Sequence, residues 1–181
     1  MSILSVYHVS SPELPNKVLT HFEDIASTLA AVGVTFKQLP VTTAVKAGAS
    51  HENVADTCRV QIDQLMTELG HTEVEVISVE GQPGQHADLR AGLLSEHQYS
   101  TDEVRYFLAG RGLVSLRIGE FVYAVLCEKN DLIAVPAGTR RWFDLGEHPR
   151  LVAIRLFRDA TGREAKLTGE TLSREFPGLD D

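Results

Sequence analysis

Two segments of the chain place their hydrophobic residues at the three- and four-residue spacing of an amphipathic helix. The first spans residues 20–33, where four apolar residues share one face: Phe22, Ile25, Leu29 and Val32. Thr20 and Glu23 have the spacing of a capping box at its start, and Gly33 is expected to end it. A second helix is predicted over residues 54–69, followed by Gly70. Each helix has one apolar stripe, so we expect both to pack against a sheet.

From residue 73 onward the pattern changes to short apolar or alternating runs, which predict strands. These runs cover residues 73–79, 103–108, 112–118, 121–127, 131–135 and 151–157. Turn signals separate them at residues 109–112, 119–120, 129–130, 136–138 and 146–149. A short helix is predicted over residues 86–94, and residues 40–50 fit either a loop or an edge strand. Many short strands in succession predict a β-sandwich or barrel.

Composition and charge limit the class of protein. The length of 181 residues suits one domain, and 43% hydrophobic with 23% charged residues is typical of a globular protein. The formal net charge of −8 argues against nucleic acid as a partner. The start of the chain lacks an export signal and no apolar run approaches a membrane span, so we expect a cytoplasmic protein with no membrane partner. Cys58 and Cys127 are expected to be reduced thiols.

Two stretches carry side chains suited to binding or acid–base chemistry. In EHQYSTDEVRYFLAGRG, His97, Tyr99 and Glu103 have the spacing of a hairpin in a jelly-roll barrel. Because residues two apart on a strand share a face, positions 97 and 99 are expected to project together into the barrel. In CEKNDLIAVPAGTRRWFDLGEHP, a strand ends in a Pro-Ala-Gly turn before Arg141, and this turn is expected to direct Arg141 inward.

These stretches resemble the cupins and, within them, the acireductone dioxygenases. The resemblance extends over essentially the whole chain and includes EVRYFLAGRG, YAVLCEKNDLIAVPAGT, WFDLGE, AIRLF and TGETLSREFP. It implies one mainly β domain over residues 1–181: a cupin double-stranded β-helix (jelly-roll barrel) at about residues 73–160, with the N-terminal helices packed on it. It also implies a dioxygenase of methionine salvage, in which three histidines and one glutamate bind a single Fe²⁺ or Ni²⁺ and O₂ is added to an enediol.

Carried over position by position, the metal-ligand set of the family falls on His97, Tyr99, Glu103 and Arg141. His97 and Glu103 match, whereas Tyr99 and Arg141 stand where the resemblance implies histidines. A phenol with an ordinary pKa of about 10 is a poor ligand for Fe²⁺ or Ni²⁺. A guanidinium group has no acceptor lone pair and repels a dication. We therefore expect a metal site that is weakened or lost, with His97 and Glu103 as the remaining ligands.

The two substitutions alter a site in which Arg105 and Arg155 match the family. Arg163 stands where the resemblance implies a tryptophan, and Leu93 where it implies a phenylalanine. Up to four arginines are thus expected to converge near the barrel mouth together with Phe143. Clustered guanidinium groups in a partly dry pocket bind carboxylate, phosphate or enediolate oxygens. Arg105, Arg155, Phe143, Arg163 and Leu93 are therefore the predicted substrate-binding residues for a small anionic metabolite.

Simpler interpretations of the individual side chains stay open. Without a metal, Glu103 is a structural ion-pair partner of Arg105 or Arg141. Tyr99 either fills space with its hydroxyl on Glu103 or donates a proton. His148, in the loop after the second stretch, is a candidate to replace a missing ligand.

Three functions are compatible with these residues. The leading hypothesis is a divergent enzyme, an oxygenase, isomerase or lyase, that acts on a small anionic, enolisable substrate with little or no metal. His97, Glu103, Tyr99 and Arg141 are its predicted catalytic residues, and arginines stabilise developing negative charge. The first alternative is a metal-dependent acireductone dioxygenase that uses Fe²⁺ or Ni²⁺ and O₂. The second is a non-catalytic metabolite-binding pseudoenzyme, and in each case a monomer is expected.

Overall fold

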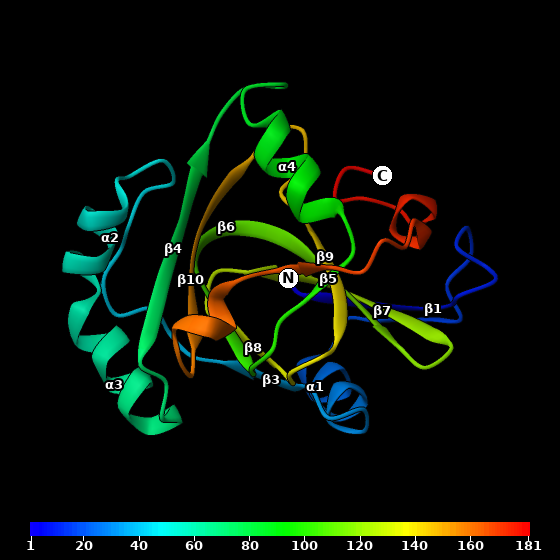
Figure 1. Ribbon diagram of the computed structural model, residues 1–181, viewed down its shortest axis with the longest axis horizontal. Helices are drawn as coiled ribbons and strands as arrows, with labels where there is room; N and C mark the ends of the chain where they lie inside the picture. The colour runs from blue at the N-terminus through cyan, green and yellow to red at the C-terminus, as the bar shows by residue number, and fades with distance from the viewer.

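All 181 residues are described by a computed structural model, in which antiparallel strands form a barrel with helices on its outside (Figure 1). The elements, in chain order, are β1 (Ile3–His8), β2 (Lys17–Leu19), α1 (Phe22–Ala30), β3 (Thr35–Gln38), α2 (His51–Thr57), α3 (Arg59–Leu69), β4 (Glu73–Glu80), α4 (Ala87–Leu94), β5 (His97–Gln98), β6 (Glu103–Ile118), β7 (Phe121–Glu128), β8 (Asp131–Val135), β9 (Arg140–Asp144), β10 (Arg150–Phe157), the 3₁₀ helix η1 (Ala160–Arg163), β11 (Lys166–Leu167) and the 3₁₀ helix η2 (Leu172–Glu175).

Strand β6 belongs to both sheets of the barrel and joins them. Its first half pairs with β10 and β8, in the sheet that β4 and β3 complete. Its second half pairs with β7 and β9, in the sheet that continues to β1, β2, β5 and β11. Side chains at the start of β6 therefore lie between the two sheets, where Glu103 and Arg105 point into the interior.

Gly110 allows β6 to pass from one sheet to the other without a break. Its φ of 70° lies in the left-handed region, and a Cβ atom placed there would collide with the backbone carbonyl of Arg150 on β10. The pairing of β10 with β6 changes register between Val152 and Ala153, beside this point. The prediction of a turn at residues 109–112 between two strands is therefore wrong, because the glycine forms a bulge within a single strand.

The helices cover the outside of the barrel, and their ends differ in part from the prediction. Helix α1 begins after His21, whose side chain makes no capping hydrogen bond, so the predicted capping box of Thr20 and Glu23 does not form. The second predicted helix is divided at Cys58 into α2 and α3, and it begins at residue 51 because Ser50 caps it by accepting a hydrogen bond from the Asn53 amide. Gly33 and Gly70 both take positive φ after their helices, as predicted.

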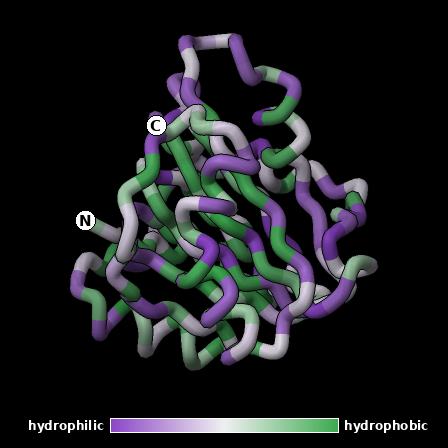
Figure 2. The backbone as a smooth tube through the Cα atoms, turned by 90° about the vertical axis from the view of Figure 1, so that its left-hand side faces the viewer, coloured by the Kyte–Doolittle hydropathy of each residue, from purple (hydrophilic) through white to green (hydrophobic).

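Apolar side chains fill the barrel and the space beneath the helices. Hydrophobic residues run along the interior strands, while hydrophilic residues gather in the outer loops (Figure 2). One core cluster lies inside the barrel and includes Phe107 and Phe143. A second joins the apolar stripe of α2 and α3 to the outer faces of β4, β6 and β10, as the helix pattern predicts. None of the helices is long and apolar enough to cross a membrane.

The remaining differences concern short strands that the hydrophobic pattern did not predict. These are β1, β2, β3, β9 and β11, and most have five residues or fewer. Residues 40–50, where loop and edge strand were both open, form a loop without strand structure. Strand β9 is the important addition for function, because it carries Arg141 directly opposite His97 of β5.

The role of Gly110 can be tested by adding a single methyl group. We expect Gly110→Ala to lower the free energy of unfolding by roughly 3 kcal/mol or more, because backbone strain is combined with a backbone collision. Gly119→Ala is the matched control, since Gly119 also has positive φ but its added Cβ would have no neighbour within 4 Å. Its expected loss is about 1 kcal/mol in urea unfolding. Equal losses would show that the close approach at Gly110 is unimportant.

Candidate functional site

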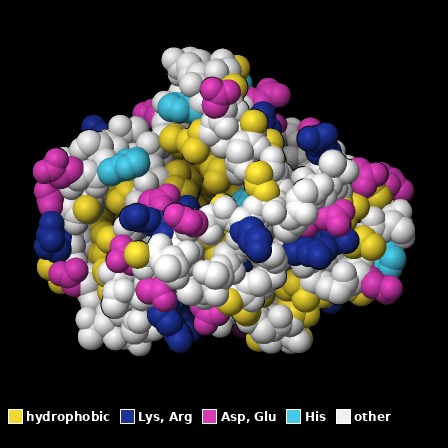
Figure 3. Space-filling model, viewed as in Figure 1, with side chains coloured by type: hydrophobic (Ala, Val, Ile, Leu, Met, Phe, Trp, Pro, Cys, Tyr) yellow, Lys and Arg dark blue, Asp and Glu magenta, His cyan; other side chains and the backbone are white.

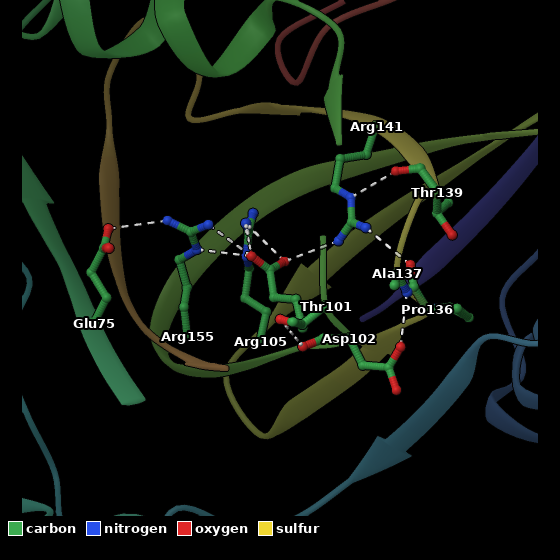
Figure 4. Close-up of polar contacts among 10 residues, drawn as sticks. Glu75, Thr101, Asp102, Arg105, Pro136, Ala137, Thr139, Arg141 and Arg155 are labelled. Atoms are coloured by element: carbon green, nitrogen blue, oxygen red, sulfur yellow. Dashed lines mark hydrogen bonds and ion pairs between the residues drawn. The ribbon is translucent and has the colours of Figure 1, made fainter. Parts of the chain in front are cut away.

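A buried carboxylate, that of Glu103, lies at the centre of the barrel interior and is surrounded by three arginines. Its Oε1 accepts hydrogen bonds from Arg105 Nη2 at 3.1 Å and from Arg141 Nη1 at 3.4 Å. Its Oε2 accepts from Arg155 Nε at 3.0 Å and Nη2 at 2.8 Å. The side chains of Glu103 and the three arginines are only 2–6% exposed. Figure 4 shows the three guanidinium groups converging from different strands.

Arg141 is held in place by the turn that precedes β9. Its Nε donates to the Thr139 carbonyl at 3.1 Å, and its Nη2 donates to the Pro136 carbonyl at 3.2 Å. With Nη1 on Glu103, each guanidinium nitrogen has a protein acceptor. The neighbouring Arg140 points outward and is 45% exposed, so the alternation predicted for this pair is correct. Arg141 is thus a built-in part of the barrel wall rather than a mobile side chain.

The other two arginines differ in how many of their donors are occupied. Arg155 is fully engaged, because its remaining nitrogen, Nη1, donates to Glu75 Oε1 at 3.0 Å. Glu75 comes from β4 and is 39% exposed, so it connects the cluster with the surface. Arg105 stacks over the Phe143 ring at 4.6 Å, and its Nε is buried without a hydrogen-bond partner. Arg105 is therefore the arginine with a donor left for another molecule.

His97 faces the cluster as a neutral base. Its Nδ1 lies 2.7 Å from the Ser95 carbonyl, which requires the proton on Nδ1 and leaves a lone pair on Nε2. Nε2 is buried and has no hydrogen-bond partner. Burial, followed by the positive charge of Arg105, lowers the pKa of His97 to about 4 against the opposing effect of the Ser95 carbonyl. The imidazole is therefore uncharged at neutral pH.

Tyr99 packs its ring between cationic groups. The guanidinium carbons of Arg141 and Arg155 lie 5.0 Å and 4.9 Å from its centroid, and the ring of His97 meets it edge-on at 5.4 Å. Its hydroxyl makes no hydrogen bond with Glu103, so that interpretation of Tyr99 is wrong. Burial and the charge of Glu103 raise the pKa of Tyr99, so the phenol keeps its proton at neutral pH.

The three arginines also determine the charge of Glu103. Burial alone would raise the pKa of this carboxyl group, but Arg105, Arg155 and Arg141 outweigh the effect and hold the pKa well below its ordinary range. The pKa of Arg155 is raised despite burial, chiefly by Glu103, whereas burial lowers the pKa of Arg141. The single 3.4 Å contact of Arg141 with Glu103 offsets the effect of burial on its pKa less than the two shorter contacts of Arg155 do. Glu103 is therefore ionised throughout the neutral range.

Some residues predicted for the site lie elsewhere. Arg163 is exposed on η1 and has no contact with the cluster, so three arginines converge rather than four. Leu93 is half-buried on α4 and packs against the core cluster inside the barrel. His148 is exposed in the loop between β9 and β10, beside Leu179 and Asp180, and contacts no residue of the site. Phe143 lies inside, under Arg105, as expected.

Two hollows lie on the outside of the barrel. A cavity of about 670 Å³ lies between β5, the turn after β8 and η1, and Tyr99 lines it together with Thr161 and Lys166. Figure 3 shows a second hollow, lined by hydrophobic atoms, below α4 on the face that Figure 1 presents. A small molecule could reach the cluster from such a hollow only after displacing buried side chains, since the cluster itself is closed.

Comparison with known proteins connects this site with a family. A model of the ARD/ARD′ family matches residues 8–165. The chain belongs to the acireductone dioxygenase family. It is 58% identical over all 181 residues to a protein of Pseudomonas fluorescens strain Pf-5 named acireductone dioxygenase, and 59% identical, again over the full length of both chains, to one of that name from Pseudomonas syringae pv. syringae.

The family assignment confirms the predicted resemblance and the fold. A solved acireductone dioxygenase structure from Bacillus anthracis has a TM-score of 0.75, with 22% identity over 92% of this chain and 98% of that chain. At that identity it shows the fold alone, a mainly β cupin barrel. That structure is described with a cadmium ion in its active centre. The relatives support an oxidoreductase of the dioxygenase type, and they imply a metal cofactor for the family.

The residues of this chain do not fit such a metal. No cluster of three or more His, Cys, Asp or Glu side chains in the chain is arranged to hold an ion. Only His97 Nε2 is a strong ligand atom without a partner, because a protonated phenol such as Tyr99 is a weak ligand and both oxygens of Glu103 are occupied by guanidinium groups. A dication bound to Glu103 Oε1 would lie at most about 5.5 Å from Arg141 Nη1 and be repelled by roughly 6 kcal/mol at an effective dielectric constant of about 20.

Several residues of the cluster were not predicted from the sequence. Glu75 lies on a different strand from Arg155, so their contact depends on the pairing of β4 with β10, which no local pattern reveals. The Pro136 and Thr139 carbonyls are backbone groups, and the Pro-Ala-Gly turn was the only signal of their orientation. The turn itself is fixed by Asp102, whose carboxylate accepts a hydrogen bond from the Ala137 amide at 2.8 Å.

The dependence of the fold on Glu103 gives a first prediction about the site. We expect Glu103→Gln to lower the free energy of unfolding by about 3–5 kcal/mol, because it leaves buried guanidinium groups without their counter-ion. Glu75→Gln is the control, since Glu75 is half-exposed and pairs with one arginine only; its expected loss is at most about 1 kcal/mol. Chemical denaturation of both variants measures the difference. Similar small losses would mean that the cluster contributes little to stability.

His97 gives a second prediction, about pH. The folded chain keeps this imidazole neutral to a pKa of about 4, whereas the unfolded chain binds a proton below about 6.5. Stability from this group is therefore complete above about pH 6.5 and falls between about pH 6.5 and pH 4. The free energy of unfolding of the wild type is expected to fall between pH 7.5 and pH 5, and His97→Gln should make that fall smaller by about 2 kcal/mol, as measured by urea unfolding at both pH values. His148→Gln, at an exposed histidine, should keep the wild-type profile, and an unchanged profile in both variants would contradict the assignment.

Proposed function

We propose that this chain is an oxidoreductase that acts on a small anionic enediol, acireductone or a close analogue, with O₂ as co-substrate. The observation that carries this proposal is identity of 58–59% over the whole length to proteins named acireductone dioxygenase. These names support the first alternative drawn from the sequence better than the leading hypothesis of altered chemistry. Cytoplasmic location, a monomeric state and one domain over residues 1–181 stay predictions.

His97 and Arg105 are the groups that we propose to contact the substrate. A hydroxyl of the enediol would donate to the free lone pair on His97 Nε2, and His97 would accept its proton. The unpaired Nε of Arg105 would donate to the resulting enolate oxygen. In a site that excludes water, such a fixed donor stabilises developing negative charge more than it would in solvent. Arg155 would act indirectly, by keeping Glu103 in place.

A second function has its own supporting observation. Glu103 is occupied by Arg141 and the other arginines, which favours metal-independent chemistry such as isomerisation or elimination, starting from proton removal by His97. A non-catalytic protein that only binds an anionic metabolite would use the same two groups. The three functions differ in what they consume and what they release.

One assay separates these functions. Acireductone is supplied to the purified chain, and O₂ uptake and products are followed in parallel with and without added Fe²⁺ or Ni²⁺. Enzyme-dependent O₂ uptake above the rate of the buffer supports the proposed oxidoreductase. Conversion without O₂ uptake would support isomerase or lyase chemistry instead. A rise in melting temperature with acireductone recovered unchanged would contradict catalysis of any kind.

The proposed role of Arg105 gives a further prediction. We expect Arg105→Gln to weaken binding of an enediol analogue roughly 10- to 100-fold, since a charge-assisted hydrogen bond is worth about 1.5–3 kcal/mol. Arg163→Gln is the control, because Arg163 was predicted to bind substrate but is exposed and apart from the cluster. Calorimetric titration measures both affinities. An effect of Arg163→Gln as large as that of Arg105→Gln would place the ligand at η1 instead.

A further inference from the structure

We propose that Arg141 is a built-in cation that takes the place of a metal ion beside Glu103, so that the chain folds without metal and does not bind Fe²⁺ or Ni²⁺ through this carboxylate. This inference concerns the chain's own side chains and goes beyond the proposed substrate and reaction. It follows from three features of the cluster: the occupied carboxylate, the anchored guanidinium and the tyrosine packed against it.

The carboxylate of Glu103 has no free position for a metal ion. Four nitrogens of Arg105, Arg141 and Arg155 donate to its two oxygens at 2.8–3.4 Å. A metal–carboxylate bond of about 2.0–2.2 Å would have to displace at least one of these donors. The other buried carboxylates, those of Glu96, Asp131 and Asp144, already have partners outside the cluster. Glu75, the second acidic group of the cluster, is already the partner of Arg155. Binding a metal would therefore leave a buried guanidinium unpaired.

The guanidinium of Arg141 is fitted to the position in which it lies. Two backbone carbonyls from one turn, those of Pro136 and Thr139, accept its Nη2 and Nε, and Glu103 accepts its Nη1. Its side chain is 2% exposed. A buried cation with an acceptor for every nitrogen is preorganised, so no rearrangement is needed to neutralise Glu103. The turn thus supplies two carbonyl acceptors for the guanidinium group, and a metal ion bound to Glu103 would not need them.

Tyr99 completes this arrangement as a partner of Arg141 rather than as a metal ligand. Its ring face lies 5.0 Å from the Arg141 guanidinium carbon and 4.9 Å from that of Arg155, within the range of cation–π contacts. The ring of Tyr99 is thus packed against the two guanidinium groups that neutralise Glu103. Tyr99 and Arg141 therefore act as a pair, and reversing one without the other should not recreate a metal site.

Wild-type protein provides the decisive measurement. After expression with added iron or nickel and dialysis without chelator, we expect elemental analysis to find well below one ion per chain, and Ni²⁺ to leave the melting temperature unchanged. About one ion per chain, lost in the Glu103→Gln variant, would overturn the proposal. Neither readout needs a substrate, so failure of the proposed oxidoreductase activity would leave this test intact.

A pair of double variants locates the built-in cation. Tyr99→His combined with Arg141→His is expected to bind about one Ni²⁺ and to melt roughly 5–10 °C higher when Ni²⁺ is about 100-fold above its Kd. Tyr99→His combined with Arg140→His is the control, because Arg140 lies on the same strand but points outward; it should bind no Ni²⁺. A folded Tyr99→His/Arg141→His protein that binds no metal would show that Arg141 does not occupy the metal position. If that variant does not fold, the wild-type measurement decides alone.

Discussion

The interior of this barrel depends on one interaction, the neutralisation of the Glu103 carboxylate by three guanidinium groups. Each arginine comes from a different strand: Arg105 from β6, Arg141 from β9 and Arg155 from β10. Burying a single charge costs several kcal/mol, and ion pairs compensate that cost only when geometry and hydrogen bonding are complete. The carboxylate lies on the strand that the two sheets share. Each sheet can therefore pack as observed only if the other sheet also brings its arginine to the cluster.

The excess of positive charge explains the state of the neighbouring aromatic side chains. His97 stays neutral because burial and Arg105 both oppose its protonation. Tyr99 stays protonated through burial, and it offers the electron-rich face of its ring to two arginines. Of the four buried side-chain polar atoms without partners, two belong to this site, His97 Nε2 as an acceptor and Arg105 Nε as a donor. In a native interior such atoms are rare, and a complementary pair facing the same cluster suggests a ligand with one hydroxyl and one anionic oxygen.

Membership of the acireductone dioxygenase family and the chemistry of this site point in different directions on the question of metal. The relatives carry the family name at 58–59% identity and thereby support an oxidoreductase. The side chains present here instead support arginine as the cation of the site, since the guanidinium of Arg141 lies where a dication would need to bind the carboxylate. Both statements hold if the chain acts on the same class of substrate as its relatives but uses arginine in place of a metal ion, because fixed cations stabilise the negative charge of an enolate as a metal does.

Much of the fold was predictable because strand and helix patterns are local, whereas the site depended on contacts between strands. Alternation placed positions 97 and 99 together and turned Arg141 inward while Arg140 faced outward. Gly110 misled the prediction, since positive φ serves a turn and a bulge equally and only the carbonyl of Arg150, far along the chain, decides between them. Arg163 was misplaced for a similar reason: its sequence position does not reveal that η1 leaves its side chain exposed.

Calorimetric titration of Ni²⁺ into wild-type protein at neutral pH tests the central claim most directly, that the Glu103 carboxylate is committed to Arg141 and its two neighbouring arginines. We expect no saturable heat beyond dilution. A saturable one-to-one isotherm that disappears in the Glu103→Gln variant would contradict the claim.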